Sequence, residues 1–328
     1  MRRTRSSLAA VVLTAALTAA MAVAGCGAGS PPQAESPPGG SAGQIVVEHT
    51  LGTTTLPKRP ERVVTLTDRD TDTALALGVV PVGIRTLYGF DSGAGPWSQD
   101  RLGGATPTVW KSRELNFEGI AALRPDLIVN ANGDADRTVY DRLSAIAPTI
   151  GLPKGQVPYG ASTESTTLLV AQALGLPEQG RRLVDDLQDF LRSQAAAHPE
   201  FSRVTASYLD VHSSGILAYP QGHLINRVLT DLGFGMPDMV RAIPAGTKSF
   251  DVSPESVAGY AGQVMVVYPY DRTLADIERQ VPTFAALDAV REGRVVLLTD
   301  QSFSAASVLS LRYGVDRLVP EIARSLQT

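Results

Sequence analysis

The residues best suited to chemistry in this sequence are aromatic and arginine side chains in stretches that follow predicted strands. Aromatic rings offer an apolar contact face with a polar edge, and the arginine fork matches carboxylate or catecholate oxygens. In an open α/β sheet, ligands bind beyond the carboxyl ends of the strands, where many of these stretches lie. We therefore expect non-covalent ligand binding by one set of residues: Arg85, Tyr88, Trp97, Trp110, Tyr219, Arg241, Tyr270 and Phe303. Further loop candidates include Asp68, Arg69, Asn132 and His212.

Signals for catalysis or for a resident metal are weak. The sequence has no G-x-G-x-x-G, no P-loop and no G-x-S-x-G elbow. Residues 132–136 faintly resemble a calcium loop but lack the remaining ligand spacing. The single Cys excludes multi-cysteine metal sites, and only His212 and His223 fall near one predicted cleft. We expect no catalytic residues, no metal and no cofactor, with a lipid-tethered hydrolase as an alternative.

The start of the chain predicts export and anchoring. Three arginines precede an apolar run at 8–24 that ends in Val-Ala-Gly-Cys. This pattern is typical of a secretory signal peptide over residues 1–25. The Val-Ala-Gly-Cys sequence resembles the bacterial lipobox, which implies a lipid on Cys26 and a place on the outer face of the cytoplasmic membrane. Residues 26–44 are small, polar or Pro and are predicted to form a disordered tether.

Beyond the tether the pattern is α/β in two halves, predicted lobes at 45–176 and 200–328. An amphipathic helix is expected at 71–77, and 305–326 is expected to be one helical stretch. Between the lobes, an interlobe helix is predicted at 177–199, with Pro177 in its first turn and apolar residues three or four apart. The net charge of −4 and the absence of a basic cluster after the first five residues argue against nucleic acid as a partner.

One short pattern occurs in both halves. Asn116-Phe117-Glu118 and Ser253-Pro254-Glu255 each place a capping residue before a predicted helix, and each Glu lies nine positions before a predicted strand. A Glu in the first turn of a helix can simply complement the helix dipole. The repetition instead favours two equivalent lobes.

The order of these segments resembles the ferric-siderophore and cobalamin class of ABC-transporter substrate-binding proteins. The resemblance covers most of the chain and is carried, after the lipobox, by LPKRPERVVTL, ALALGVVPVGI, NFEGIAALRPDLIV, LSAIAPTI, HLINRVLTDLGF and DVSPESVAGYAGQVMVV. It implies two Rossmann-like lobes bridged by a single long helix, with a ligand cleft between them.

The resemblance also implies a function, with the iron(III)-chelate branch favoured. A monomer would deliver a ferric siderophore to a permease dimer, on which Glu118 and Glu255 would dock. A haem- or corrinoid-binding protein of the same fold remains an alternative, as does a tethered iron-chelate sensor without a permease.

Overall fold

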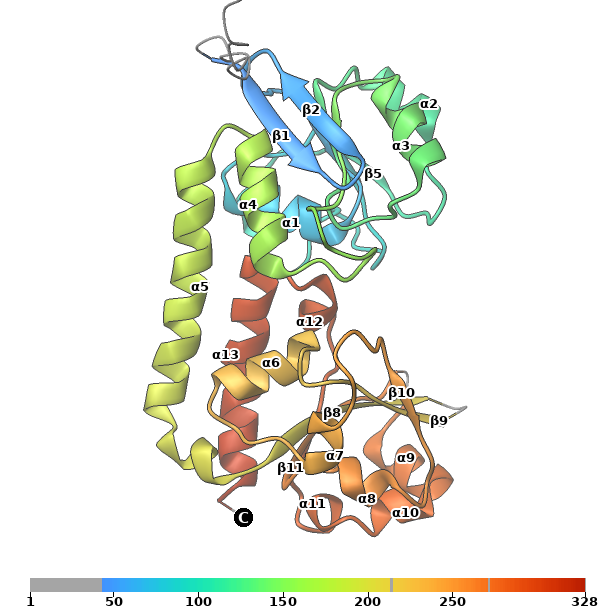
Figure 1. The fold of residues 1–328 in the computed structure, drawn as a ribbon, viewed down its shortest axis with the longest axis vertical. Coiled ribbons are helices and arrows are strands. Elements are labelled where there is room, and N and C mark those ends of the chain that lie inside the picture. Colours follow the sequence, from blue (N-terminus) through green and yellow to red (C-terminus); the bar gives the residue numbers. More distant parts are fainter. Residues whose placement is uncertain (1–42, 213–214, 271, 328) are drawn as a thin grey trace, which may run out of the picture. The chain divides into compact units, whose positions relative to one another are not determined.

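The computed structural model describes residues 43–212, 215–270 and 272–327 (Figure 1). The predicted signal peptide, Cys26 and almost all of the predicted tether lie outside these residues. Within the described part of the chain, every helix is too short or too polar to cross a membrane.

The first lobe is built on a parallel sheet of five strands in the order β5-β4-β3-β6-β7. The strands are β3 (Val63–Thr65), β4 (Gly83–Arg85), β5 (Thr108–Trp110), β6 (Leu127–Val129) and β7 (Thr149–Ile150). Before it comes the antiparallel hairpin of β1 (Ile45–His49) and β2 (Gly52–Leu56). The helices are α1 (Asp68–Ala76), η1 (Gln99–Leu102), α2 (Phe117–Ala122), α3 (Arg137–Ser144) and α4 (Thr163–Ala173). β3, β4 and β6 are buried throughout, as expected for the centre of a parallel sheet.

The second lobe is built on a mixed sheet in the order β10-β9-β8-β11-β12. Its parallel strands are β8 (Ala206–His212), β11 (Val264–Tyr268) and β12 (Val295–Leu297), and β9 (Gly215–Ala218) and β10 (Phe250–Val252) extend it antiparallel. Around it lie η2 (Pro199–Arg203), α6 (Leu224–Asp231), α7 (Asp238–Arg241), α8 (Val257–Tyr260), α9 (Leu274–Gln280), α10 (Pro282–Ala285) and α11 (Asp288–Arg291). The predicted α/β class is thus confirmed, with a sheet in each lobe.

The predicted long helix is confirmed as α5 (Pro177–Ala197). Pro177 occupies its first turn, and the chain leaves the helix at His198, just before Pro199. α5 packs against α4 of the first lobe and against α6 and η2 of the second (Figure 1). Its buried residues include Val184, Phe190 and Leu191, so the apolar stripe predicted from the sequence is the face that packs.

The predicted helical stretch at 305–326 is largely confirmed as α13 (Val308–Ser325), and a separate short helix, α12 (Ser302–Ala305), precedes it. Ala306 between them has a φ of +52°, a left-handed conformation that ends a helix. Ser307 then starts α13 through a reciprocal cap with Ser310. α13 packs against both α5 and α1, so it contacts the first lobe as well as the second (Figure 1).

The expectation that the first helix is amphipathic was wrong. All nine residues of α1 are buried, although six of them are Asp, Arg or Thr. The threonines form internal bonds: Thr71 Oγ1 lies 2.8 Å from Thr65 Oγ1, and Thr73 Oγ1 donates to the Arg69 carbonyl at 2.8 Å. α1 is enclosed by α4 and α13 and carries a polar core at the junction of the lobes.

Candidate functional site

Two cavities that share residues form the candidate ligand site. The larger has a volume of about 450 Å³ and the smaller about 70 Å³. Arg69, Tyr159 and Ser304 line both of them. The larger cavity is also lined by Gln156 and Ser162 of the first lobe and by Tyr208, His223, Arg227 and Phe303 of the second. Side chains from both lobes therefore face one space.

The local folds explain why these side chains meet. Arg69 lies in the first turn of α1, directly after β3, where Thr67 Oγ1 caps the helix by accepting from the Asp70 amide. Tyr208 lies on β8, and Asn226 on α6 holds that strand by accepting from the Tyr208 amide at 3.1 Å. The approach to α6 (Gly222 and His223) and the start of the helix (Leu224, Ile225 and Arg227) border the cavity. The site thus forms where strands and helices of both lobes converge, as in other open α/β folds.

Arg69 is the buried centre of this junction. Its Nε donates to the Ala305 carbonyl at 3.0 Å, and its Nη1 donates to Asn132 Oδ1 at 3.1 Å and to the Ala161 carbonyl. Burial lowers the pKa of the guanidinium to about 10, partly offset by Tyr88 and nearby aspartates. Arg69 therefore stays charged at neutral pH while its hydrogen bonds go to neutral oxygens.

The segment between α12 and α13 is held in the first lobe by two more bonds. Thr163 Oγ1 donates to the Ala306 carbonyl at 2.7 Å, and Ser307 Oγ donates to Asp72 Oδ2 at 2.9 Å. This segment directly follows Phe303 and Ser304, which line the larger cavity. Polar contacts with the first lobe therefore fix a part of the cavity wall that the second half of the chain supplies.

A second polar network lies beside the cavity in the second lobe. Asp210 Oδ2 accepts from the Tyr219 hydroxyl at 2.7 Å and from the Tyr270 hydroxyl at 3.3 Å, and His212 Nε2 lies 4.0 Å away. Burial, followed by interactions with Asp210, raises the pKa of Tyr219 and raises that of Tyr270 to about 12. The phenols therefore remain protonated, and the Asp210 carboxylate is their acceptor.

Aromatic stacking joins this network to the cavity. His223 stacks on Tyr208 at 5.3 Å between ring centroids and lies 4.3 Å from Tyr219. Burial, and then Arg227, lower the pKa of His223 to about 4, so its imidazole is neutral at pH 7. Its Nδ1 atom is buried without a hydrogen-bond partner among the described residues. His223 therefore faces the site as a neutral ring.

Four of the eight predicted ligand residues lie at or beside the site. Tyr88 lines the smaller cavity and Phe303 the larger. Tyr219 and Tyr270 belong to the Asp210 network, adjoining Tyr208 rather than lining a cavity. Direct contact with a ligand stays a prediction for all four.

The other four predicted residues lie elsewhere. Arg85 donates to the backbone carbonyls of Leu66, Ser112 and Arg113, which occupies its guanidinium. Arg241 is exposed on α7 and pairs with Asp238 on the same helix. Neither residue lines the two cavities.

Both tryptophans also lie outside the cavities. Trp97 Nε1 donates to Asp72 Oδ2 at 2.6 Å, and its ring packs between Phe90 and Tyr313. Trp110, expected in a loop, is on edge strand β5 and packs on the core of the first lobe. Neither tryptophan therefore lines the candidate site.

Several lining residues were missed as ligand candidates. Tyr159 is a half-exposed loop residue that follows a Pro- and Gly-rich stretch. Its left-handed φ of +56° could not be predicted from the sequence. Arg227 lies on α6 and Tyr208 on β8, whereas the ligand residues were expected in loops. The first turn of a helix that starts at the strand ends would have been the better signal.

The two predicted docking residues, Glu118 and Glu255, are both exposed. Glu118 is in the first turn of α2, where Asn116 caps the helix as predicted. Glu255 is not helical: the Ser253 carbonyl accepts from the Ser256 amide at 3.0 Å in a turn, and α8 begins only at Val257. The expected repeat of cap and helix is therefore correct in the first lobe and wrong in the second.

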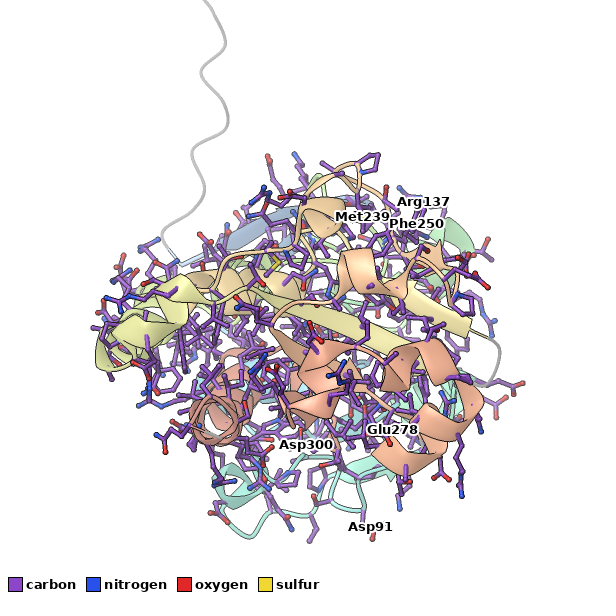
Figure 2. The ribbon with its side chains drawn as sticks, turned by 90° about the horizontal axis from the view of Figure 1, so that it is seen from below. Asp91, Arg137, Met239, Phe250, Glu278 and Asp300 are labelled. Carbon is purple, nitrogen blue, oxygen red and sulfur yellow. The ribbon has the colours of Figure 1, made fainter. Side chains whose placement is uncertain are left out.

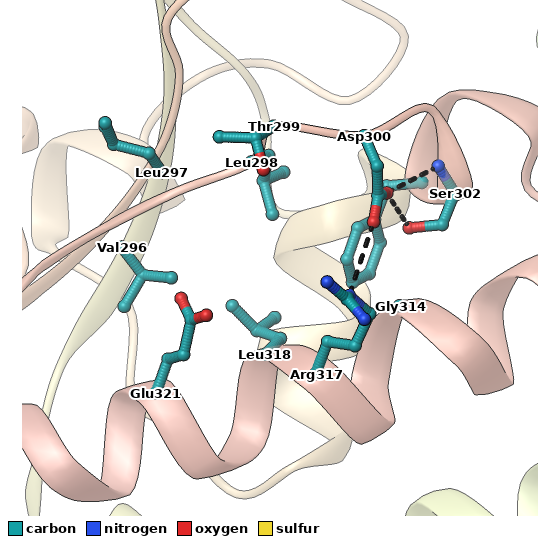
Figure 3. A pocket seen from close by; sticks show the side chains of 11 residues that line it. Val296, Leu297, Leu298, Thr299, Asp300, Ser302, Gly314, Arg317, Leu318 and Glu321 are labelled. Atoms are coloured by element: carbon teal, nitrogen blue, oxygen red, sulfur yellow. Dashed lines mark hydrogen bonds and ion pairs between the residues drawn. The ribbon is translucent and has the colours of Figure 1, made fainter. Parts of the chain in front are cut away.

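Other pockets lie outside this site, including one of about 320 Å³ that Arg85 and Tyr159 line in the first lobe. Among the described residues, no group of three or more His, Cys, Asp or Glu could hold a metal ion. A separate pocket beside α13 has a volume of only about 40 Å³ (Figure 3). There Asp300 accepts from the Ser302 amide at 2.9 Å and lies 3.7 Å from Arg317 Nε, so this carboxylate already has partners.

Comparison with known proteins identifies relatives over most of the chain. The Fe(3+)-citrate-binding protein YfmC of Bacillus subtilis is 25% identical over 303 residues, covering 89% of this chain and 90% of its own. The probable siderophore-binding lipoprotein YfiY of Bacillus subtilis is 29% identical over 196 residues, which cover 58% of this chain and only 57% of its own length.

Solved structures share the fold. A periplasmic solute binding protein from Mycobacterium smegmatis has a TM-score of 0.74 at 28% identity, covering 87% of this chain and all of its own. PiaA of Streptococcus pneumoniae, solved in complex with ferrichrome, has a TM-score of 0.73 at 24% identity, covering 86% of this chain and 99% of its own. The sequence profile described as periplasmic binding protein matches residues 63–302, a span that includes both sheets. The chain therefore belongs to the periplasmic binding protein family, which confirms the resemblance noted in the sequence.

Proposed function

We propose that the protein is an extracytoplasmic solute-binding lipoprotein that captures an iron(III)-siderophore and delivers it to an ABC permease. The observation that carries this proposal is the cavity of about 450 Å³ lined by phenol, guanidinium and aromatic groups from both lobes. A ferric chelate combines an apolar or amide periphery with oxygen atoms, and these side chains suit both parts. YfiY is named as a probable siderophore-binding lipoprotein and YfmC as an Fe(3+)-citrate-binding protein, and both names support the same ligand class.

The binding is non-covalent and needs no resident cofactor or metal, because the chelate is cargo. A micromolar to nanomolar affinity corresponds to roughly −8 to −12 kcal/mol, which a few desolvated arginine and aromatic contacts can supply. The protein acts as a monomer, held at the outer face of the cytoplasmic membrane by a lipid on Cys26.

The direct test is isothermal titration calorimetry of the purified soluble protein with ferric dicitrate, ferrichrome, ferrioxamine B, a ferric triscatecholate, haem and cobalamin. Calorimetry is preferable to tryptophan fluorescence because neither Trp97 nor Trp110 lines the cavities. We expect saturable binding of at least one iron(III) chelate. Tight binding of haem or cobalamin alone would instead support the alternative function in the same fold.

The permease would bind the surfaces around Glu118 and Glu255. Near Glu255, two large apolar side chains are exposed: Phe250 on β10 is 43% exposed and Met239 on α7 is 41% exposed (Figure 2). Met239 packs on Gly259 of α8, and Phe250 stacks with Tyr260 at 5.7 Å, so both flank the turn that carries Glu255. An acidic residue beside exposed apolar groups suits a protein partner that supplies arginines.

Charge reversal tests this docking. The double variant Glu118→Lys and Glu255→Lys should lose iron-chelate uptake in cells while its ligand affinity in solution stays within about twofold of wild type. Glu164→Lys is the matched control, because Glu164 is exposed in the first turn of α4 as Glu118 is in α2. Equal loss of uptake and affinity, or loss of uptake in the control, would contradict docking through these residues.

A further inference from the structure

We infer that the ligand is an anionic ferric chelate and that Arg227 on α6 is the residue that selects for its charge. This inference rests on the proposed function, which leaves the chelate's charge open.

Arg227 supplies a cation that is not neutralised. It lines the larger cavity and its side chain is exposed. Among the described residues, no carboxylate forms an ion pair within 4.0 Å of its guanidinium. Asp231 lies one helical turn further along α6 and interacts with Arg227 electrostatically. Burial raises the pKa of Asp231, and Arg227 lowers it only in part. The guanidinium fork is therefore available to a ligand.

The rest of the cavity adds positive charge and no negative charge. Arg69 is the second guanidinium in its wall, and its hydrogen bonds go to neutral oxygens. Of the described residues that line the larger cavity, none is Asp or Glu. His223 is neutral at pH 7, so the cations that face the space are Arg69 and Arg227.

The carboxylates close to Arg69 offset the positive charge of the cavity wall only in part. Asp68 lines the smaller cavity, where it accepts from Thr86 Oγ1 at 2.5 Å and from the Leu87 amide at 2.8 Å. Asp70 and Asp72 are buried behind Arg69, and burial raises the pKa of both, to about 7 and about 6. In the described part of the chain, these carboxylates lie on α1 and do not line the larger cavity beside Arg227.

Two other features suit an anionic chelate that also has an apolar periphery. The first turn of α6 borders the cavity without a side-chain cap, so its amide groups add to the positive potential. Tyr159 and Tyr208 line the same space with aromatic faces. A chelate with peripheral carboxylate or catecholate oxygens would satisfy the fork of Arg227, whereas a neutral trihydroxamate would leave it unpaired and a cationic chelate would be repelled.

The test compares chelates of different charge on variants of the soluble protein. Calorimetry would use ferric dicitrate and a ferric triscatecholate as anions, ferrichrome as a neutral chelate and ferrioxamine B as a cation. The variants are Arg227→Gln, Arg227→Lys and the control Arg241→Gln, which removes an exposed arginine outside the cavities. Urea unfolding of each variant would verify that it is folded.

We expect wild type to prefer at least one anionic chelate over ferrichrome and ferrioxamine B. Arg227→Gln should weaken that binding about 10- to 100-fold, the range for a hydrogen bond to a charged group, and should reduce its dependence on salt. Arg227→Lys should restore part of the loss, and Arg241→Gln should bind like wild type.

The possible failures are distinguishable. Wild type that prefers a neutral or cationic chelate, or an Arg227→Gln variant that keeps its affinity for the anion, would overturn the charge selection and leave the proposed function intact. Wild type that binds no iron chelate would overturn both.

Discussion

Replacement of Asp70 by Asn should make the protein more stable at neutral and alkaline pH. Asp70 is fully buried in α1, and neither carboxylate oxygen has a well-formed hydrogen bond within the described structure. Burial raises the pKa of this carboxyl from 3.8 to about 7, although Thr67, Arg69 and the Ala131 backbone lie near enough to lower it in part. Its negative charge is therefore a cost to the folded state.

The sign and size of the effect follow from this raised pKa. Between pH 4 and 7 the folded protein holds a proton that the unfolded chain has lost, so the free energy of unfolding falls as pH rises. A shift of about three units corresponds to roughly 4 kcal/mol, reached above pH 7. Burial of the amide that replaces the carboxyl would offset about 1–2 kcal/mol. Asp70→Asn should thus gain about 2–3 kcal/mol at pH 8 and lose this advantage toward pH 4.

Urea unfolding of the soluble protein at pH 4.5, 6 and 8 measures this directly. Asp185→Asn is the control, because Asp185 is exposed on α5 and its replacement should change little at any pH. The reasoning would be refuted by a difference between Asp70→Asn and wild type that does not change with pH, or by a variant that is less stable at pH 8.

Two further predictions concern the junction of the lobes. Thr163→Val should reduce the free energy of unfolding by about 1–2 kcal/mol, because the buried Ala306 carbonyl loses its donor; an unchanged urea midpoint would contradict this. In a Trp110→Phe protein, the fluorescence emission of Trp97 should titrate with a midpoint near pH 6. Trp97 Nε1 donates to Asp72, and burial raises the pKa of this carboxyl to about 6. A flat profile between pH 5 and 7 would show that Asp72 does not titrate there.

The sequence predicts the long helix, the two sheets and the fold class because these depend on local patterns. α5 has a first-turn proline, a stripe of apolar residues and a terminating proline, all readable within a few residues. β3 and β6 are short apolar runs that need only a sheet to bury them. These elements are set by periodicity and composition.

The errors arise where distant parts of the chain decide the environment. α1 reads as amphipathic, yet α4 and α13 both pack on it, and Ser307 at the start of α13, from the other end of the chain, donates to Asp72. Trp110 became part of edge strand β5 through pairing with β4, which local propensity does not reveal. At Glu255, the chain turns directly after β10 and has no room for a helix before residue 257.

The same limit applies to the candidate site. The rule that ligands lie beyond strand ends pointed to Tyr88 and to Arg69, both of which line a cavity. It could not tell a free arginine such as Arg227 from Arg85, whose guanidinium is occupied by backbone carbonyls. Whether a guanidinium is free to bind a ligand depends on whether the fold places backbone carbonyls within hydrogen-bond distance of it.

The bonds that hold the segment between α12 and α13 also constrain the order in which the protein can be completed. Arg69 and its acceptor Ala305 are 236 positions apart, and Asp72 and Ser307 are 235 apart. During synthesis the whole first lobe is made before Ala305 and Ser307. Until then, Arg69 and Asp72 lack these partners and stay unpaired or hydrated. Contacts of such separation form late because the intervening chain has to be ordered first. The lobe that is made first is therefore completed only after Ala305 and Ser307 of the second half have been made.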